Sequence, residues 1–419
     1  MSKLKIGVFG GARGDTMIQV LLNHPDAVLV AVCDKYEPLL ERAKKNAAEA
    51  GLNIECFTDF DDFIKYDMDA VVLANYATEH ATFAVRCLRA GKHVLSEVLP
   101  CETMAQAVEL IEAVEETGLV YAYAENYCYM KDTFEIWQRY KENTVGEISY
   151  AECDYVHDCS SCWVEITYGE ASHWRNHLCP TFYCTHSLGP ILAATGRRPV
   201  QVVGFENPPI EEFYTLGHAG GHASGIEMVT LDNGAIVKSI HGPLKLEPSH
   251  TEYKLYCKKG YLGTEKERNV RCYVEGEELC KGENKVYTPD KYICKSAADI
   301  AGLESHGGSD FYPTHFFVEK ILGRPDGEWS IDVYSAVDMG IIGILAFRSI
   351  LGGNVPVRIP DLRNKEERDA FRNDNACTNP LVAGDQVLPS SSYPEREITA
   401  QQEAKNRALW HEIEKSRES

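Results

Sequence analysis

The first 125 residues alternate short apolar runs with longer segments whose apolar positions recur every three to four residues. Such runs predict buried strands, and the intervening periodicity predicts amphipathic helices. Strands that alternate with helices of this length imply a parallel sheet covered by helices on both faces. We therefore predict an α/β domain with a doubly wound parallel sheet over residues 1–125, with strands at 4–11, 27–34, 69–76, 93–98 and 119–125 and helices at 15–25, 36–51, 80–91 and 103–118.

The pattern changes after Glu125. Later segments alternate apolar and polar residues, as strands with one buried face do. Within residues 225–242, Asp232-Asn233-Gly234 separates two such runs, and an Asn-Gly pair supplies the positive φ angles of a tight hairpin turn. We predict an α+β domain over 126–362 with an open-faced, mostly antiparallel sheet, and a polar C-terminal extension over 363–419. Its elements are helices at 131–143, 332–353 and 400–416 and strands within 146–158, 225–242 and 251–265.

The composition narrows the possible partners and compartment. A chain of 419 residues can form two domains with sizeable cores. Its formal charge of −21 argues against nucleic acid and anionic membranes, which both need a basic face. No apolar run approaches the roughly 20 residues of a membrane span, and the N-terminal apolar segment runs straight into glycines, unlike a signal peptide. We expect a cytoplasmic protein whose 15 cysteines are reduced thiols.

One group of cysteines has an alternative interpretation. Cys159-Ser-Ser-Cys162 has the two-residue gap of a zinc knuckle or a redox pair. A strong zinc signal would show a second such pair at a regular distance, and the sequence has none. We therefore expect ordinary thiols and no metal at the cluster of Cys153, Cys159, Cys162, Cys179 and Cys184, near which lie His157, His173 and His177.

A glycine-rich turn follows the first predicted strand. Gly10-Gly11-Ala12-Arg13-Gly14 resembles the G-x-G-x-x-G fingerprint, although Ala12 replaces the second glycine and Gly14 comes one residue early. Asp34 ends the second strand about 20 residues on, where a carboxylate binds the ribose hydroxyls and repels a 2′-phosphate. We therefore predict that residues 1–125 form an α/β Rossmann nucleotide-binding domain and that its cofactor is NAD. The predicted cofactor-binding residues are Gly10, Gly11, Ala12, Arg13, Asp34, Asn75, His80, Glu97 and Asn126.

Several short segments, in order along the chain, carry a resemblance to a known family. "ATEHATFAVRCLRAGKHVLSE" is similar to the Gfo/Idh/MocA sugar oxidoreductases, but Val98 and Leu99 lie between Glu97 and Pro100 where many of them carry a lysine. "SEVLP", "AENYCY", "DYVHD", "HWRN", "FYCTHSLGP", "HGGSDF" and "IDVYSA" resemble glycoside hydrolase family 109 more specifically. That resemblance implies an NAD-dependent glycoside hydrolase without net redox change. The sugar would be oxidised at C3, lose its C2 proton, eliminate the aglycone, add water and be reduced again.

The resemblance also implies catalytic roles. His186, in a Tyr-x-x-His pattern, would take the C3 hydroxyl proton in place of the absent lysine. Tyr183 would assist there or handle the C2 proton, and Tyr155 is the second candidate for C2 proton transfer. The predicted substrate-binding residues are Glu125, Asn126, His157, His173, Trp174, Arg175, His306 and Asp310.

Two departures and two alternatives remain open. Gly189 stands where many family oxidoreductases carry an aspartate, which fits the hydrolases better. The segment from Cys159 to Tyr168 does not match the known hydrolases, so a preference for α-linked N-acetylgalactosamine does not carry over. The alternatives are an NAD-dependent glycoside 3-dehydrogenase and a non-catalytic NAD-binding sugar sensor. The open sheet should expose an apolar face, which predicts a homodimer or homotetramer.

Overall fold

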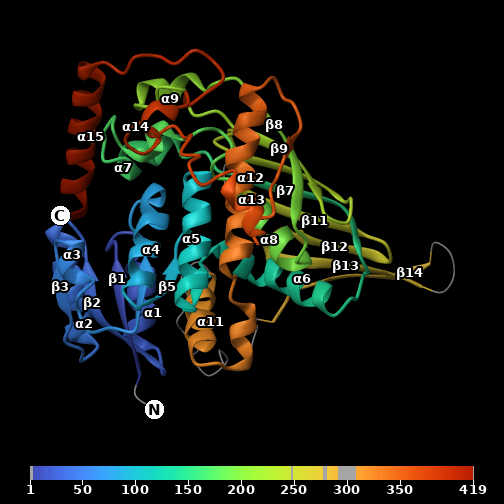
Figure 1. The fold of residues 1–419 in the computed structure, drawn as a ribbon, viewed down its shortest axis with the longest axis horizontal. Coiled ribbons are helices and arrows are strands. Elements are labelled where there is room, and N and C mark those ends of the chain that lie inside the picture. Colours follow the sequence, from blue (N-terminus) through green and yellow to red (C-terminus); the bar gives the residue numbers. More distant parts are fainter. Residues whose placement is uncertain (1–2, 247–248, 277–280, 291–307, 419) are drawn as a thin grey trace.

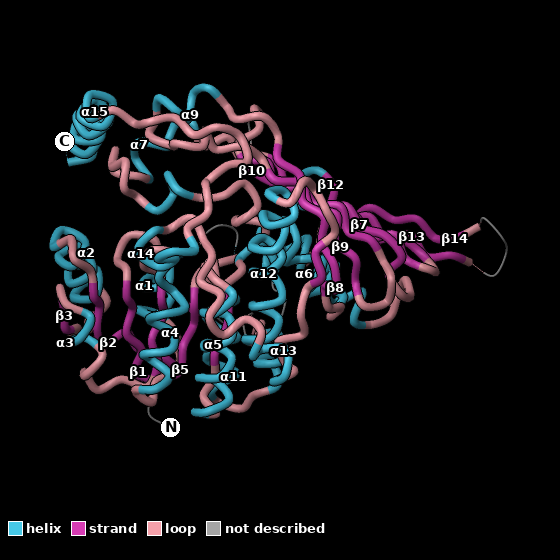
Figure 2. The backbone as a smooth tube through the Cα atoms, turned by 45° about the horizontal axis from the view of Figure 1, so that its top comes forward, coloured by secondary structure: helices cyan, strands magenta, loops and turns pink. Residues whose placement is uncertain are grey.

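The computed structural model describes residues 3–246, 249–276, 281–290 and 308–418 (Figure 1). Two sheets, with helices packed on them, organise this part of the chain. Figure 2 shows the smaller sheet beside the N-terminus and the larger one extending away from it. Both ends of the chain lie beside the first domain, because the C-terminal helix packs on the side of the molecule where that domain lies.

The first sheet confirms the predicted Rossmann domain. Its six strands are all parallel, in the order β3-β2-β1-β4-β5-β6. Only β3 was not predicted, because three half-exposed residues give no apolar run. The strands are β1 (Leu4–Phe9), β2 (Ala27–Cys33), β3 (Glu55–Phe57), β4 (Ala70–Leu73), β5 (His93–Ser96) and β6 (Tyr121–Tyr123); the helices are α1 (Asp15–Asn23), α2 (Glu37–Glu49), α3 (Phe60–Phe63), α4 (His80–Arg89) and α5 (Met104–Thr117).

A helix from far along the chain completes the core of this domain. In α11 (Phe311–Ile321), Phe317 and Val318 are fully buried in the same cluster as Ile6 and Leu95. The N-terminal end of α11 thereby brings Asp310 to the carboxyl edge of the parallel strands. Open α/β sheets bind ligands at this edge.

The second sheet confirms the predicted mostly antiparallel architecture. Its nine strands run in the order β14-β13-β12-β11-β7-β10-β9-β8-β15, and only β7 and β10 pair in parallel. They are β7 (Ile148–Val156), β8 (Pro199–Glu206), β9 (Gly225–Leu231), β10 (Ile236–Gly242), β11 (His250–Cys257), β12 (Gly260–Glu265), β13 (Asn269–Glu275), β14 (Gly282–Tyr287) and β15 (Val357–Arg358).

The turn between β9 and β10 differs from the prediction. Only Gly234 has a positive φ, of 85°, so Asn233 does not supply a second one. The Leu231 N–H donates to Ala235 O at 2.8 Å and the Gly234 N–H donates to Leu231 O at 2.9 Å. The loop is therefore a three-residue turn that ends in a left-handed glycine. It is one residue longer than the predicted two-residue turn and still joins two antiparallel strands.

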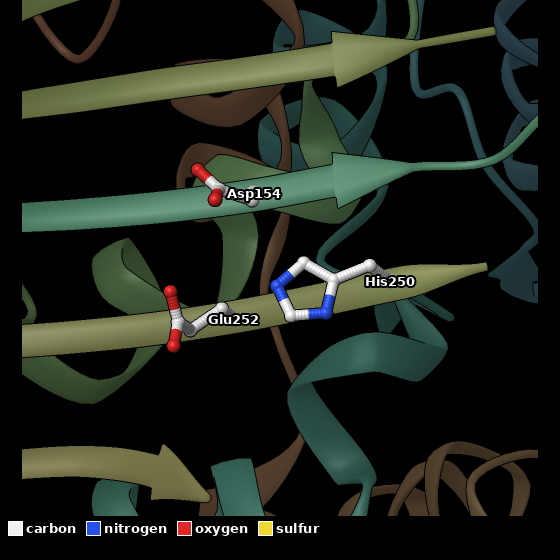
Figure 3. Close-up of side chains that lie close together, drawn as sticks. All are labelled: Asp154, His250 and Glu252. Atoms are coloured by element: carbon white, nitrogen blue, oxygen red, sulfur yellow. The ribbon is translucent and has the colours of Figure 1, made fainter. Parts of the chain in front are cut away.

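The two faces of the large sheet have different environments. The helices α6 (Lys131–Lys141), α8 (Thr185–Thr195) and α12 (Val333–Leu351) cover one face, where Tyr155 lies. The other face is uncovered among the described residues and carries Asp154, His250 and Glu252 (Figure 3). Exposed Phe205 and Tyr256 lie on this open face too. Self-association through it stays a prediction.

The long apolar helix corrects one expectation from the sequence. α12 has 19 residues and is long and apolar enough to cross a membrane. It is nevertheless largely buried, packed against β8, α5 and α8. Its composition is therefore that of a core helix.

The C-terminal extension packs against both domains. It contains α13 (Lys365–Asp369), α14 (Pro380–Ala383) and α15 (Ala400–Glu418). The Arg407 guanidinium in α15 donates to Glu170 at 2.9 Å, and Tyr36 in the first domain donates to Glu414 at 2.5 Å. Fully buried Arg368 donates to Glu115 on α5 at 2.7 Å and to the Leu362 carbonyl at 2.6 Å.

Replacing Arg368 with methionine should lower the free energy of unfolding by about 2–3 kcal/mol, because the Glu115 carboxylate loses its bidentate partner and the Leu362 carbonyl loses its donor. Arg372→Met is the matched control: its pair with Glu112 is exposed, and such pairs contribute about 0–1 kcal/mol. Urea unfolding of both variants measures the difference. Equal losses would show that the Arg368 contact does not hold the extension in place.

Candidate active site

The glycine-rich loop has the geometry that a dinucleotide requires. Gly10 has a φ of +100°, and a Cβ there would lie 2.4 Å from the Ala74 carbonyl oxygen. A Cβ on Gly14 would lie 2.2 Å from the Gly10 oxygen. The Gly11 N–H donates to the Asp34 carboxylate at 2.7 Å, which places Asp34 beside the loop at the end of β2. Ala12 lies in the same turn, before α1, so the residues fit NAD with the diphosphate at the loop and the ribose at Asp34.

Gly10→Ala should weaken NAD binding by roughly tenfold or more, because the strained loop must move to relieve the clash with Ala74. Gly118→Ala is the matched control: its φ of +64° is also strained, but no atom lies within 4 Å of the new Cβ and it ends α5, a different element. Calorimetric titration with NAD measures both. Unchanged affinity in Gly10→Ala would contradict the assigned position of the diphosphate.

Arg13 extends from this loop toward buried acidic residues. Its guanidinium Nη2 lies 2.7 Å from Glu97 Oε1 and 2.6 Å from Asp310 Oδ1. Burial raises the pKa of Glu97 and Arg13 partly offsets it. In the structure Arg13 connects the glycine-rich loop to Glu97 and to Asp310 at the start of α11. Its contact with NAD stays a prediction.

Two further cofactor candidates differ in position. The His80 ring is buried between the carbonyls of Leu99, at 3.2 Å from Nδ1, and Asn75, at 3.3 Å from Nε2, and burial lowers its pKa to about 4. It therefore supports the two loops rather than presenting a free ring nitrogen. The Asn75 Nδ2 donates to Glu79 at 3.0 Å, while its buried Oδ1 has no hydrogen-bond partner among the described residues. That oxygen is free to accept a hydrogen bond from a ligand.

A carboxylate and a histidine form the centre of the site. Glu125 follows β6, is fully buried, and its Oε1 lies 2.7 Å from His186 Nδ1 on α8. A carboxylate at Nδ1 stabilises the tautomer with its proton there and leaves Nε2 as the basic nitrogen. The second Glu125 oxygen is buried without a hydrogen-bond partner in the described part of the chain. The pair can thus take a proton at Nε2 and accept a hydroxyl at Oε2.

Three tyrosine rings surround His186. The ring centroids of Tyr127, Tyr155 and Tyr183 lie 4.6, 4.8 and 5.1 Å from that of His186. Burial raises the pKa of all three, that of Tyr127 to about 12. They are therefore phenols at neutral pH and serve first as hydrogen-bond donors. The positive charge of Arg175 lowers the pKa of Tyr183 and so partly offsets the effect of burial.

Aromatic and cationic side chains form a wall beside these tyrosines. The Trp174 ring stacks at 6.5 Å from Tyr183, and the Arg175 guanidinium lies 4.4 Å from Trp174 and 5.6 Å from Tyr183. His173 packs on Tyr76 at 5.0 Å, and burial lowers its pKa to about 3. Stacked rings and a cation are typical of sugar-binding walls.

The structure brings together most of the predicted residues. His157 joins the cluster through its Nδ1, 3.1 Å from the Tyr155 hydroxyl. Asn126 begins the 3-10 turn (Asn126–Tyr129) after Glu125, and His306 lies outside the described residues. Sequence reasoning missed Tyr127, although "AENYCY" contains it, because the residue has no motif of its own. It assigned Glu125 to substrate and did not foresee its contact with His186.

Comparisons with known proteins place both domains. Residues 4–125 match the model of the oxidoreductase family with an NAD-binding Rossmann fold, Gfo/Idh/MocA. Residues 228–367 match the glycosyl hydrolase 109 C-terminal domain. The chain joins a Gfo/Idh/MocA nucleotide-binding domain to a glycosyl hydrolase 109 C-terminal domain. The family resemblance, the Rossmann fold and NAD as cofactor are thereby confirmed.

Curated relatives match along most of this chain and most of their own length. A glycosyl hydrolase family 109 protein from Stenotrophomonas maltophilia is 25% identical over 86% of this chain and 89% of its own. One from Phocaeicola vulgatus is 23% identical over 86% and 84%. These likenesses extend over most of the chain and support an enzyme of the oxidoreductase and glycosyl hydrolase 109 type.

Solved structures with this fold include a sugar dehydrogenase and inositol dehydrogenases. Levoglucosan dehydrogenase in complex with NADH and L-sorbose has a TM-score of 0.68 at 15% identity, over 86% of this chain and all of the other. Scyllo-inositol dehydrogenase from Lactobacillus casei, with NAD(H) and scyllo-inositol bound, has 0.64 at 19%, over 87% and 100%. At these identities the likeness shows the fold alone.

Proposed function

We propose that this protein is an NAD-dependent glycoside hydrolase that acts by transient oxidation at C3. The observation that carries the proposal is the Glu125–His186 pair, held at 2.7 Å and enclosed by three tyrosines, on the side of Glu97 and the glycine-rich loop. It provides a base without the missing lysine, together with additional proton donors that simple alcohol oxidation does not need. The names of the full-length relatives support the same conclusion.

His186 carries the first proton transfer. With its Nδ1 proton held by Glu125, Nε2 accepts the proton of the C3 hydroxyl, and the buried carboxylate stabilises the imidazolium that forms. When bound, NAD supplies the acceptor for the C3 hydride and returns that hydride at the end. His186 then gives its proton back to the C3 oxygen, so one residue serves both directions.

The tyrosines carry the elimination. A C3 ketone acidifies the C2 hydrogen, so a modest base removes it. Tyr183 fits this role once its own proton has passed to a neighbouring group, because the cation of Arg175 then stabilises the phenolate that burial disfavours. Tyr155, whose hydroxyl contacts His157 Nδ1 at 3.1 Å, can pass a proton between that imidazole and the departing group.

A glycoside 3-dehydrogenase is the second candidate, favoured by the structural likeness to sugar dehydrogenases. It would use His186 as the base and Glu97 near the cofactor, as the hydrolase would. It would then release the ketosugar. The two reactions differ in net redox change, which a hydrolase lacks. A non-catalytic sensor would bind NAD and show neither product.

The deciding experiment is NMR in D₂O with mixed α- and β-glycosides and catalytic NAD⁺. Aglycone release with deuterium at C2 and no accumulated NADH is the expected result and also reveals the accepted anomer. A 3-ketosugar formed with stoichiometric NADH would make the protein a dehydrogenase. Absence of both products across the panel, with NAD bound, would favour the sensor.

A further inference from the structure

Cys159 and Cys162 lie in one tight turn next to the site. The Cys162 N–H donates to the Cys159 carbonyl at 3.1 Å, which closes a turn of four residues. Such turns hold their end Cα atoms within about 7 Å, and disulfides form at about 4.4–6.8 Å. Both thiols are free and only half-buried, so small molecules in solution can reach them. The backbone therefore already has a conformation close to the one that a Cys-x-x-Cys disulfide needs.

The two sulfurs are also electronically different. The Cys162 Sγ lies 3.5 Å from the Cys159 carbonyl oxygen. The Cys159 side chain is the largest influence that lowers the pKa of Cys162 to about 7, and Arg175 acts in the same direction. The Cys162 side chain and burial both raise the pKa of Cys159. A thiolate is the reactive form of cysteine, so Cys162 is the nucleophile and Cys159 the partner that follows.

A chain of contacts leads from Cys159 to the catalytic pair. Its Sγ lies 3.5 Å from His157 Nδ1, and the same nitrogen lies 3.1 Å from the Tyr155 hydroxyl. The Tyr155 ring in turn packs on His186 at 4.8 Å. If the Cys159 sulfur moves, His157 Nδ1 loses one of its two contacts. The same nitrogen contacts the Tyr155 hydroxyl, so the position of Tyr155 depends on Cys159.

We propose that Cys159 and Cys162 form a reversible two-electron redox site for hydroperoxides that switches the active site off. The Cys162 thiolate attacks a peroxide oxygen, the O–O bond breaks, and an alcohol or water leaves after taking a proton. The Cys159 sulfur then attacks the sulfenic acid of Cys162 and expels water. Two thiols and one hydroperoxide thus give one disulfide, one alcohol or water, and one water. A dithiol reductant restores the thiols by exchange.

The effect on turnover rests on the proposed hydrolase function, but disulfide formation does not. The full-length protein is treated with hydrogen peroxide, alkylated and analysed by peptide mass. We expect a loss of two hydrogens in the Cys159–Cys162 peptide, reversed by dithiothreitol, and a roughly 10- to 100-fold fall in turnover as Tyr155 loses its alignment. Cys162→Ser should keep its turnover under peroxide, while Cys56→Ser, a half-buried thiol in β3, should remain as sensitive as the wild type. No disulfide, or equal inactivation of Cys162→Ser, overturns the proposal.

A second readout remains if the protein proves not to turn over glycosides. The ¹⁵N resonances of the His157 ring, assigned with His157→Gln, should shift when the disulfide forms and return on reduction. Unchanged resonances in a protein whose disulfide is confirmed by mass would show that the dithiol is not coupled to the site. The redox proposal and the hydrolase proposal can therefore fail separately.

Discussion

His186→Ala should lower glycoside turnover by roughly 10²- to 10⁴-fold, the usual contribution of a general base. The loss arises because no other basic nitrogen lies against Glu125 at hydrogen-bond distance among the described residues. KM should change little, since the ring's main role is at the reacting oxygen. The measurement is aglycone release under saturating NAD, with the fold checked by thermal unfolding. The backbone carbonyl of His186, which accepts from Tyr253 at 2.6 Å, is unaffected by the substitution.

Two further variants make this result specific. His250→Ala removes an exposed histidine from the opposite face of the large sheet (Figure 3) and should leave turnover unchanged. Glu125→Gln keeps an acceptor for the Nδ1 proton but loses the charge that stabilises the imidazolium, so we expect a smaller loss than in His186→Ala. The double variant should be no worse than His186→Ala alone, because the two residues act as one unit. Retention of more than about a tenth of wild-type turnover in His186→Ala would reject the base assignment.

Acid should destabilise the protein well before its carboxylates protonate. Buried histidines are held neutral, mainly because burial disfavours the charged ring. Their pKa values lie below the unfolded value of about 6.5. Each such histidine contributes its full stabilisation at a pH above its pKa in the unfolded chain. That contribution is lost as the pH falls toward its lower pKa in the folded protein. The group comprises His24, His173 and His218, with pKa values of about 3, and His80 and His315, with values of about 4.

Each of these histidines should remove up to about 2 kcal/mol of the free energy of unfolding between pH 7 and pH 5. Urea unfolding at both pH values measures the sum. His24→Gln, which replaces a ring held 3.1 Å from His315, should reduce the pH-dependent loss, although it also lowers stability at pH 7. His411→Gln changes an exposed ring and should leave the pH dependence as it is. A flat stability between pH 7 and pH 5 would show that these rings are not held neutral.

The sequence alone determined the features that depend on local pattern. Periods of two and of three to four residues identified most of the described strands and half of the described α-helices, and Gly10 to Gly14 with Asp34 predicted NAD as the cofactor. The turn at Gly234 shows the limit of local rules, since the pattern located the hairpin but not the number of residues in its loop. Short motifs also pointed to His186, Tyr183 and Tyr155, which the fold then placed in ring contact.

Only the tertiary structure decided which side chains act together. Glu125 and His186 are 61 residues apart, and Arg13 meets Asp310 across 297 residues. No periodicity encodes such contacts, because they depend on how α8 and α11 pack against the edge of a sheet formed by other segments. Burial, which sets the pKa of the tyrosines and neutral histidines, is likewise a property of the packed molecule. The sequence therefore determined the elements and the candidate residues, and the packing of distant elements determined their chemical pairing.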